Sequence, residues 1–305
     1  MKKKIIAIIV AIVLIIPVSR GWYEFLLDNF FDAELASSTQ LKFRKISDTE
    51  VEVVGYDSYL HGSITIPEKI RIGLDLYKVT SIGASAFYRR SSLISIKIPE
   101  GVTSIGHSVF SGCEKLTNIN IPEGVTSIGV EVFSGCSSLT SIKIPEGVTS
   151  IKSSAFLGCS RLTSITIPES LTSIGIYAFG GCSSLTSIKI PEGVTSIGGG
   201  AFYYCESLTS INIPEGVTNI GASAFYRCSR LTSINIPESV TSIGKCAFEG
   251  CNSLTSINIP EGVTSIGKEA FWGCYNLEIV IDNSENNVKV GWNAFENCKS
   301  VKWLK

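Results

Sequence analysis

The residues with the greatest chemical potential in this chain are its cysteines. Eight of the ten recur every 23 residues: Cys113, Cys136, Cys159, Cys182, Cys205, Cys228, Cys251 and Cys274. Such a series could form disulfides, bind a metal or react, because a thiolate is both a nucleophile and a ligand. Stacked repeats about 5 Å apart would permit a disulfide, but side chains in one column point in parallel. No Cys-x-x-Cys pair occurs, so we predict buried free thiols, no metal site and no cofactor.

One cysteine lies off this series. Cys246 occupies a position that varies from repeat to repeat. A variable position in a repeat is typically on the outside, and an accessible thiol is the kind that reacts. We therefore predict that Cys246 is the most reactive thiol of the chain.

Acid and base groups are few or regularly exposed. The chain has two histidines, His61 and His107, with no repeated nucleophile or acid beside them, so we predict no catalytic residue and no enzyme. A glutamate follows each repeat proline: Glu100, Glu123, Glu146, Glu169, Glu192, Glu215, Glu238 and Glu261. Neighbouring carboxylates about 5 Å apart in water repel by less than about 1 kcal/mol before screening. We interpret this column as a solvated edge, with weak divalent-cation binding as the alternative.

The variable positions supply the candidate binding residues. They carry mostly Ser and Gly, but a subset carries large aromatic or cationic side chains: Tyr177, Tyr203, Tyr204, Tyr226, Arg227, Arg230, Trp272 and Tyr275. Exposed Tyr, Trp and Arg make strong contacts in protein interfaces. We predict that Tyr177, Tyr203, Tyr204, Tyr226, Arg227, Arg230 and Trp272 bind a partner. The alternative is that they are tolerated replacements at unconstrained positions.

Charge excludes one class of partner. Lys and Arg total 26 against 27 Asp and Glu, and no basic run occurs beyond residues 2–4. Nucleic-acid binders carry a basic face that neutralises phosphates. We therefore predict no nucleic-acid partner.

These residues must be positioned by a repeat, which can be written LTSIxIPEGVTSIGxxAFxGCxS. The spacing LxxIxI, as in Leu116, Ile119 and Ile121, predicts a short strand with an inward apolar face. Ala and Gly beside the repeat phenylalanine predict a short helical turn packed against the strands. Ten phenylalanines mark ten coils: Phe87, Phe110, Phe133, Phe156, Phe179, Phe202, Phe225, Phe248, Phe271 and Phe295. A single coil cannot bury its own apolar face, so the coils must stack into a solenoid.

The ends of a solenoid need covers, because an open strand edge recruits other chains. Residues 41–78 alternate apolar and polar side chains around turn signals, which predicts a cap of β-hairpins. We place the solenoid at residues 79–281 and the last coil with a C-terminal cap at residues 282–305. Trp292 and Trp303 are the residues we expect to cover the terminal core.

The N-terminus has the layout of a secretory signal. Lys2–Lys4 precede Ile5–Val18, which has no polar side chain. As a helix these fourteen residues would rise only about 21 Å, short of the roughly 30 Å hydrocarbon core. We predict a cleaved signal peptide over residues 1–20, with an uncleaved membrane anchor as the alternative, and a linker over residues 21–40. The protein would then be secreted or at the cell surface.

IPEGVTSIG, the Ala-Phe pair and the following Gly-Cys together resemble the BspA-like (Treponema pallidum-type) class of leucine-rich repeats, over roughly residues 79–298. The entry YKVTSIGASAF at Tyr77–Phe87 is similar to the usual first repeat of that family. The resemblance implies a right-handed solenoid of the α/β class, built mostly of short β-strands with short helical turns. It also implies a surface or secreted protein that adheres to host or neighbouring-cell proteins.

From these observations we expect a non-enzymatic binding scaffold, exported or tethered by its N-terminus, that presents the solenoid to a protein partner such as a host or matrix surface protein. The alternative is a structural or self-associating spacer without a specific ligand. The repeat itself does not predict the oligomeric state.

Overall fold

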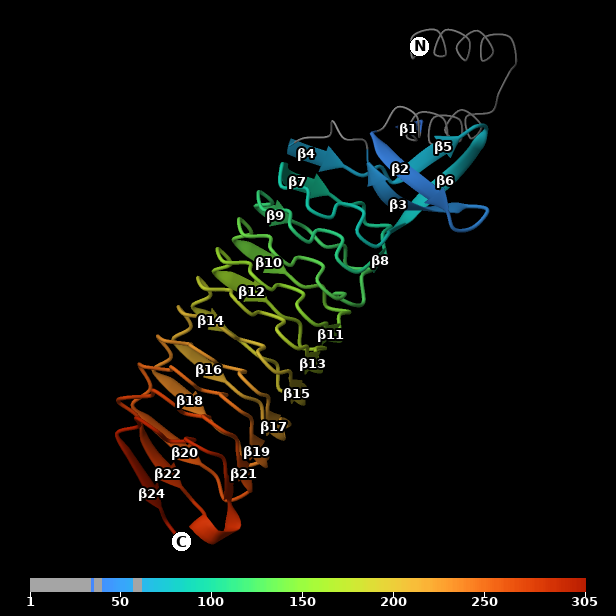
Figure 1. Ribbon diagram of the computed structural model, residues 1–305. Coiled ribbons are helices and arrows are strands. Elements are labelled where there is room, and N and C mark those ends of the chain that lie inside the picture. Colours follow the sequence, from blue (N-terminus) through green and yellow to red (C-terminus); the bar gives the residue numbers. More distant parts are fainter. Residues whose placement is uncertain (1–33, 36–39, 57–61) are drawn as a thin grey trace, which may run out of the picture.

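The chain forms an elongated stack of coils in the computed structural model, which describes residues 34–35, 40–56 and 62–305 (Figure 1). The predicted solenoid of 23-residue coils is confirmed. We number the coils by their phenylalanine, from coil 1 with Phe87 to coil 10 with Phe295. The predicted signal or anchor at residues 1–20 lies outside the described residues. Among the residues that are described, none forms a helix with the length and apolarity needed to span a bilayer.

Each coil contributes strands to two columns, which run along opposite sides of the stack in Figure 1. The first column is β6 (Asp75–Ile82), β8 (Ser104–Ile105), β11 (Ser150–Ile151), β13 (Ser173–Ile174), β15 (Ser196–Ile197), β17 (Asn219–Ile220), β19 (Ser242–Ile243), β21 (Ser265–Ile266) and β23 (Lys289–Val290). The second is β4 (Gly62–Thr65), β7 (Leu93–Lys97), β9 (Asn118–Ile119), β10 (Ser141–Lys143), β12 (Ser164–Thr166), β14 (Ser187–Ile188), β16 (Ser210–Asn212), β18 (Ser233–Asn235), β20 (Ser256–Ile259), β22 (Glu278–Ile281) and β24 (Ser300–Trp303).

Strands in a column are parallel and in register at one repeat. Ser173 pairs with Ser196 and Ile174 with Ile197. Because side chains alternate along a strand, this register keeps the paired isoleucines, such as Ile174 and Ile197, inside and the serines beside them outside. The repeat period therefore fixes the pairing without any turn-specific signal.

The expected short helical turn is instead a series of tight turns. In coil 1 the Ser85 N–H donates to the carbonyl of His107 in the next coil (3.0 Å), while the Ala86 N–H donates to Gly83 within its own coil (3.2 Å). This alternation recurs from coil to coil and places residues such as Ser108 (φ 52°) in the left-handed region. In an α-helix the backbone N–H groups donate to carbonyls of the same helix, along its axis. Half of them are used for stacking here, so no α-helix forms in this segment.

A single column of phenylalanine rings runs through the core, among buried Ile, Leu, Val, Ala and Cys side chains. Consecutive rings from Phe87 to Phe295 stack at centroid distances between 5.1 and 6.0 Å, with interplanar angles of 4° to 19°. Offset-stacked aromatic rings contribute roughly 0.5–1.5 kcal/mol each beyond their burial. The last step tolerates the one-residue slip between Phe271 and Phe295, at the cost of the longest separation.

The cysteine column lies directly beside the rings and is unpaired, as predicted. Cys113 to Cys274 are fully buried free thiols. Each thiol donates to the carbonyl of the phenylalanine one coil earlier, for example Cys136 to Phe110 at 3.2 Å. That carbonyl already accepts the Cys113 N–H in its own coil. A cysteine is small enough to fit this position and supplies the extra donor.

The N-terminal cap is a mixed sheet in the order β1-β5-β6-β3-β2. The predicted hairpins are present: β2 (Leu41–Lys45) is antiparallel to β3 (Glu50–Tyr56), and β5 (Lys69–Ile72) is antiparallel to β6. Within the predicted linker, β1 (Glu34–Leu35) pairs with β5. β3 then runs parallel to β6, so the cap continues the first strand column.

Tyr56 of the cap extends the aromatic column by one ring. It stacks on Phe87 at 5.7 Å, and the guanidinium of Arg90 lies 3.7 Å from the Tyr56 ring centroid. Arg90 occupies the cysteine position of coil 1. The first coil therefore uses a cation–π contact where the later coils use a thiol.

At the C-terminal end, β22 and β24 complete the second column and a 3-10 turn, η2 (Glu285–Asn287), replaces the Pro-Glu-Gly corner. Trp303 packs partly buried against the core, as expected. Trp292 does not: it is 67% exposed, with the ammonium of Lys268 lying 4.7 Å from its ring centroid. Trp292 follows the corner Gly291 at a position that points outward in the other coils.

The stack has one weak junction. Within the described part of the chain, neither column pairs coil 2 (99–121) with coil 3 (122–144): β8 pairs only with β6, and β9 only with β7. Four backbone hydrogen bonds in the turn segments remain across it, among them Phe110 N–H to Val132 O at 2.9 Å. Every other junction between coils keeps strand pairing in the first column, in the second, or in both.

Candidate partner-binding surface

Four tyrosines and an arginine from coils 5 to 7 form one continuous surface cluster, which we call the tyrosine cluster: Tyr177, Tyr203, Tyr204, Tyr226 and Arg227. Tyr203 and Tyr226 directly follow the core phenylalanines Phe202 and Phe225. Because they are 23 residues apart, the coil register brings their rings into a stack at 4.9 Å and 16°. Tyr204 and Arg227 come next, with φ of 55° and 54°, which turns the backbone outward.

The cluster is held by ring contacts on every side. Tyr204 packs edge-on against Tyr203 at 4.6 Å and tilted against Tyr226 at 5.5 Å. The Arg227 guanidinium lies 5.6 Å from the Tyr204 ring centroid and 5.7 Å from that of Tyr226. An arginine held between two rings loses little freedom when it binds a ligand, and it keeps its donors.

Tyr177 joins the cluster because coil 6 has a glycine beneath it. A Cβ at Gly200 (φ +63°) would lie 2.2 Å from the Tyr177 ring, so the ring occupies the space that a side chain there would fill. Tyr177 then meets Tyr203 edge to face at 5.6 Å. Gly200 is therefore part of the site, although it occupies a position that usually carries a small residue in the repeat.

Two predicted binding residues do not belong to this cluster. Among the described contacts, neither Arg230 nor Trp272 touches one of its rings; Trp272 lies two coils beyond Tyr226 with Glu249 between them in the same column. Ile176, which we did not single out, is 54% exposed beside Tyr177. The same position carries an exposed apolar valine, Val130, in coil 3 and small, polar or charged residues in most other coils, so a large branched residue next to Tyr177 was a usable signal.

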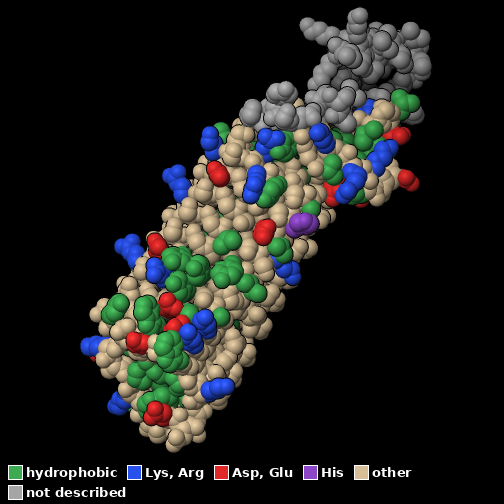
Figure 2. Space-filling model, viewed as in Figure 1, with side chains coloured by type: hydrophobic (Ala, Val, Ile, Leu, Met, Phe, Trp, Pro, Cys, Tyr) green, Lys and Arg blue, Asp and Glu red, His purple; other side chains and the backbone are tan. Residues whose placement is uncertain are grey.

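The electrostatics of the cluster favour neutral phenols. Burial is the first cause that raises the pKa of Tyr203 and of Tyr226; Tyr204 raises it further for Tyr203, and Glu249 does so for Tyr226. Tyr203 and Tyr226 therefore keep their hydroxyl protons as hydrogen-bond donors at any physiological pH. Figure 2 shows hydrophobic side chains gathered on one face of the C-terminal half of the stack, with Lys and Arg among them.

The glutamate column is solvent-exposed at every position. Outward lysines of the second strand column reach back to it: Lys143 Nζ lies 2.9 Å from Glu123 and Lys189 Nζ lies 2.6 Å from Glu169. The hydrogen bond from Lys143, followed by that from the Glu146 N–H, lowers the pKa of Glu123. Part of the like charge along this edge is thus neutralised by the chain itself.

Cys246 is not the reactive thiol that its position suggested. It is only 8% exposed, and its thiol donates to Glu269 of the next coil at 3.7 Å. Burial, followed by the hydrogen bond and charge of Glu249 and the charge of Glu269, raises the pKa of Cys246 to about 12. The prediction was wrong because two carboxylates disfavour the thiolate.

These three residues are also the only group of ligand atoms close enough for a metal among the described residues: the Cys246 Sγ and carboxylate oxygens of Glu249 and Glu269 lie within 4.8 Å of one another. A metal would have to displace a proton held with a pKa of about 12. We assign no metal to them.

The burial of the cysteines predicts that their thiols are alkylated slowly in the folded protein. We expect the folded protein to show no fast-reacting thiol toward iodoacetamide at pH 7.5, because the thiolate fraction of each buried cysteine is very small. In urea all ten cysteines should react. Mass spectrometry of the labelled protein over time measures both. One thiol reacting rapidly in the native state, with Cys246 carrying the label, would contradict the burial described above.

Comparison with known proteins gives the class of the molecule. The chain matches the BspA type leucine rich repeat region (6 copies) over residues 63–186 and 172–302. It therefore belongs to the BspA-type leucine-rich-repeat family, whose solenoid is a non-enzymatic scaffold. No curated protein matches the chain.

Solved structures of the same architecture come from several bacteria. A leucine-rich repeat protein from Bacteroides ovatus is 27% identical (TM-score 0.42), with 87% of this chain and 98% of that chain covered. The T. pallidum leucine rich repeat protein is 28% identical (TM-score 0.46), covering 73% and 90%. The pneumococcal vaccine antigen PcpA is 20% identical (TM-score 0.53), covering 90% and 89%; at that identity it supports the fold alone.

Proposed function

We propose that this protein is a binding scaffold, exported or tethered to the cell surface by its N-terminus, that engages a protein partner through the tyrosine cluster. The observation that carries the proposal is the convergence of four tyrosines and an arginine from three successive coils, in a repeat whose outer positions are mostly small or polar. Clustered Tyr and Arg side chains dominate the binding energy of protein interfaces.

The cluster also meets the physical requirements of an interface. Its rings brace one another, so little side-chain freedom remains to be lost when a partner docks. Its hydroxyls and the Arg227 guanidinium supply directional hydrogen bonds at the edge of an apolar surface. Export is supported by the Lys2–Lys4 and Ile5–Val18 pattern, and mass spectrometry of the mature N-terminus distinguishes cleavage from anchoring.

The test is a triple substitution, Tyr203→Ala, Tyr204→Ala and Tyr226→Ala, in the full chain. We expect binding to surface and matrix proteins, measured on an array and then by titration of each hit, to weaken by more than about 30-fold, as for an interface hot spot. A matched control carries Ser134→Ala, Ser137→Ala and Ser138→Ala in the turn segment of coil 3 and should bind normally. Equal binding by both variants would remove the cluster as the site, and an array without hits would favour the spacer.

A further inference from the structure

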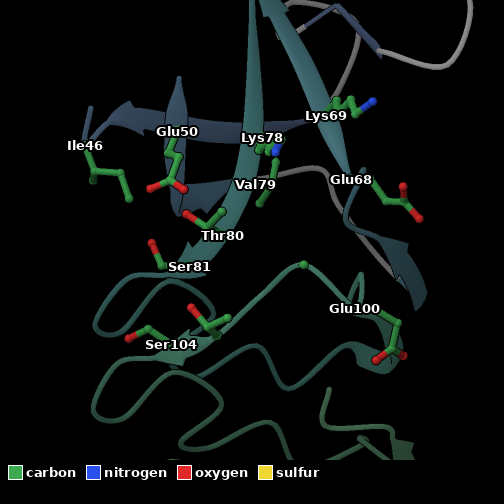
Figure 3. Close-up of a pocket in the computed structure, with 12 residues that line it drawn as sticks. Ile46, Glu50, Glu68, Lys69, Lys78, Val79, Thr80, Ser81, Glu100 and Ser104 are labelled. Atoms are coloured by element: carbon green, nitrogen blue, oxygen red, sulfur yellow. The ribbon is translucent and has the colours of Figure 1, made fainter. Parts of the chain in front are cut away.

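A crevice lies at the junction of the cap and the first two coils. It has a volume of about 670 Å³, within the usual range of about 300–1,000 Å³ for small-molecule sites. The β2–β3 hairpin, the start of β5, strand β6 and the Gly101–Ser104 segment surround it (Figure 3). It lies several coils away from the tyrosine cluster and is independent of it.

Ser81 is the feature that sets this crevice apart. It is 9% exposed, it lines the crevice, and its hydroxyl has no hydrogen-bond partner. Figure 3 shows the hydroxyls of Ser81 and Thr80 on the side of the hollow where Ile46 and Glu50 project. Buried polar groups in native proteins almost always have a partner. The Ser81 oxygen has less than 1 Å² of accessible surface of its own, so a ligand group in the crevice would complete it once the side chain turns about its Cα–Cβ bond to another staggered rotamer.

Ser81 is more buried than the residues at the same position in the other coils. The same strand position carries a serine or asparagine in coils 2 to 9, and each is exposed or half-buried, as for Ser104, Ser127 and Ser173; coil 10 has Lys289 there. In coil 1 the neighbouring strand is β3 of the cap, which places Glu52 opposite Ser81 where the later coils place another serine or an asparagine. The cap thus converts a solvated repeat serine into a buried one.

The lining specifies the chemistry of the ligand. Thr80, Ser81, Thr103 and Ser104 provide hydroxyls, while the rim carries Glu50, Glu68, Glu100, Lys69 and Lys78. Among the described residues none of these five charged groups is in an ion pair, and no three of the acidic ones converge to hold a metal. The three carboxylates disfavour the binding of an anion, and the two ammonium groups disfavour the binding of a polycation.

A neutral ligand dense in hydroxyls satisfies all of these groups, because each hydroxyl both donates to a carboxylate and accepts from an ammonium or serine. Ile46, which is 49% exposed, offers apolar surface for its C–H groups. We propose that the crevice binds a neutral carbohydrate of one or two sugar units, with the Ser81 hydroxyl as a buried contact and Glu50 as an acceptor on the rim.

The test uses the full chain and a panel of maltose, lactose, cellobiose and N,N′-diacetylchitobiose, with saturation-transfer NMR to detect binding and calorimetry to measure it. We expect at least one sugar to bind. Ser81→Ala should weaken that binding roughly tenfold, the equivalent of one hydrogen bond, and Glu50→Gln should weaken it as well. Ser127→Ala, the exposed serine of the same column, is the matched control and should leave it unchanged.

Stability separates a binding defect from a folding defect. Without ligand, Ser81→Ala should melt at the same temperature as the parent or higher, because it removes an unsatisfied buried hydroxyl and adds no atoms. The proposal is overturned if no sugar of the panel binds, if bound sugar is indifferent to both Ser81→Ala and Glu50→Gln, or if inorganic phosphate or spermidine binds in the crevice instead.

Discussion

Replacing Phe179 by alanine is expected to lower the free energy of unfolding by about 3–5 kcal/mol, the usual cost of deleting a fully buried aromatic ring. Phe179 has no exposed surface and stacks on Phe156 at 5.5 Å and on Phe202 at 5.6 Å. Its loss leaves a gap in the middle of the column that neither neighbour can fill, because both are held by their own coils. Urea denaturation followed by circular dichroism measures the change.

Phe295→Ala is the matched control. Phe295 is only half-buried and has one ring neighbour, Phe271, at 6.0 Å. We expect its replacement to cost no more than about half as much, since less surface is exposed and no ring-to-ring contact is broken on its far side. Equal losses for the two variants, or a loss below about 1 kcal/mol for Phe179→Ala, would show that the ring column does not carry the core.

The second large effect is expected at the corner glycines. A Cβ at Gly198 would lie 2.5 Å from the Ile176 nitrogen and 2.6 Å from the Gly175 carbonyl carbon. Both are backbone atoms, so no rotamer change can relieve the clash, and Gly198 N–H is itself bonded to Ile174 O at 2.8 Å. Gly198→Ala should therefore destabilise the protein by about 3 kcal/mol, at the upper end for overpacking.

The corresponding glycine of coil 3 provides the comparison. A Cβ at Gly129 would meet only the Val132 Cγ2 at 3.3 Å and the Gly106 O at 3.5 Å. Gly129→Ala should be close to neutral, because small adjustments suffice and alanine reduces the entropy of the unfolded chain. The melting temperatures of the two variants, measured by calorimetry, should differ clearly. Similar values would mean that the close approach at Gly198 is not a constraint.

The period of the sequence was sufficient to predict the solenoid, its inward isoleucines and the ring column. Once residues 23 apart are known to stack, each column of the repeat has one environment. The same logic would have found the stack of Tyr203 on Tyr226. The repeat could not predict that Tyr56 stacks on Phe87, because Tyr56 lies in the cap, where no repeat fixes which residues are neighbours.

The failures came from contacts between successive coils at positions whose residue type varies from repeat to repeat. Cys246 looked accessible because its position varies from repeat to repeat, but it is buried. Burial is the first cause that raises its pKa, and Glu249 and then Glu269 of the next coil raise it further. The prediction of a helical turn was wrong for a similar reason. Ala-Phe and Gly favour close packing, but nothing in the sequence indicates that alternate backbone N–H groups donate to carbonyls of the next coil. The position of Tyr177 depended on the missing side chain of Gly200.

The unpaired junction between coils 2 and 3 has a mechanical consequence for a molecule pulled between its two ends. Tension along the long axis acts directly on the hydrogen bonds between coils, and here only those of the turn segments resist it. The molecule should therefore separate first between coils 2 and 3. The cap would stay attached to coils 1 and 2, and the tyrosine cluster would stay intact on the coils that follow. Each further coil that peels away would release 23 residues, or roughly 80 Å of extended chain, and so absorb load gradually.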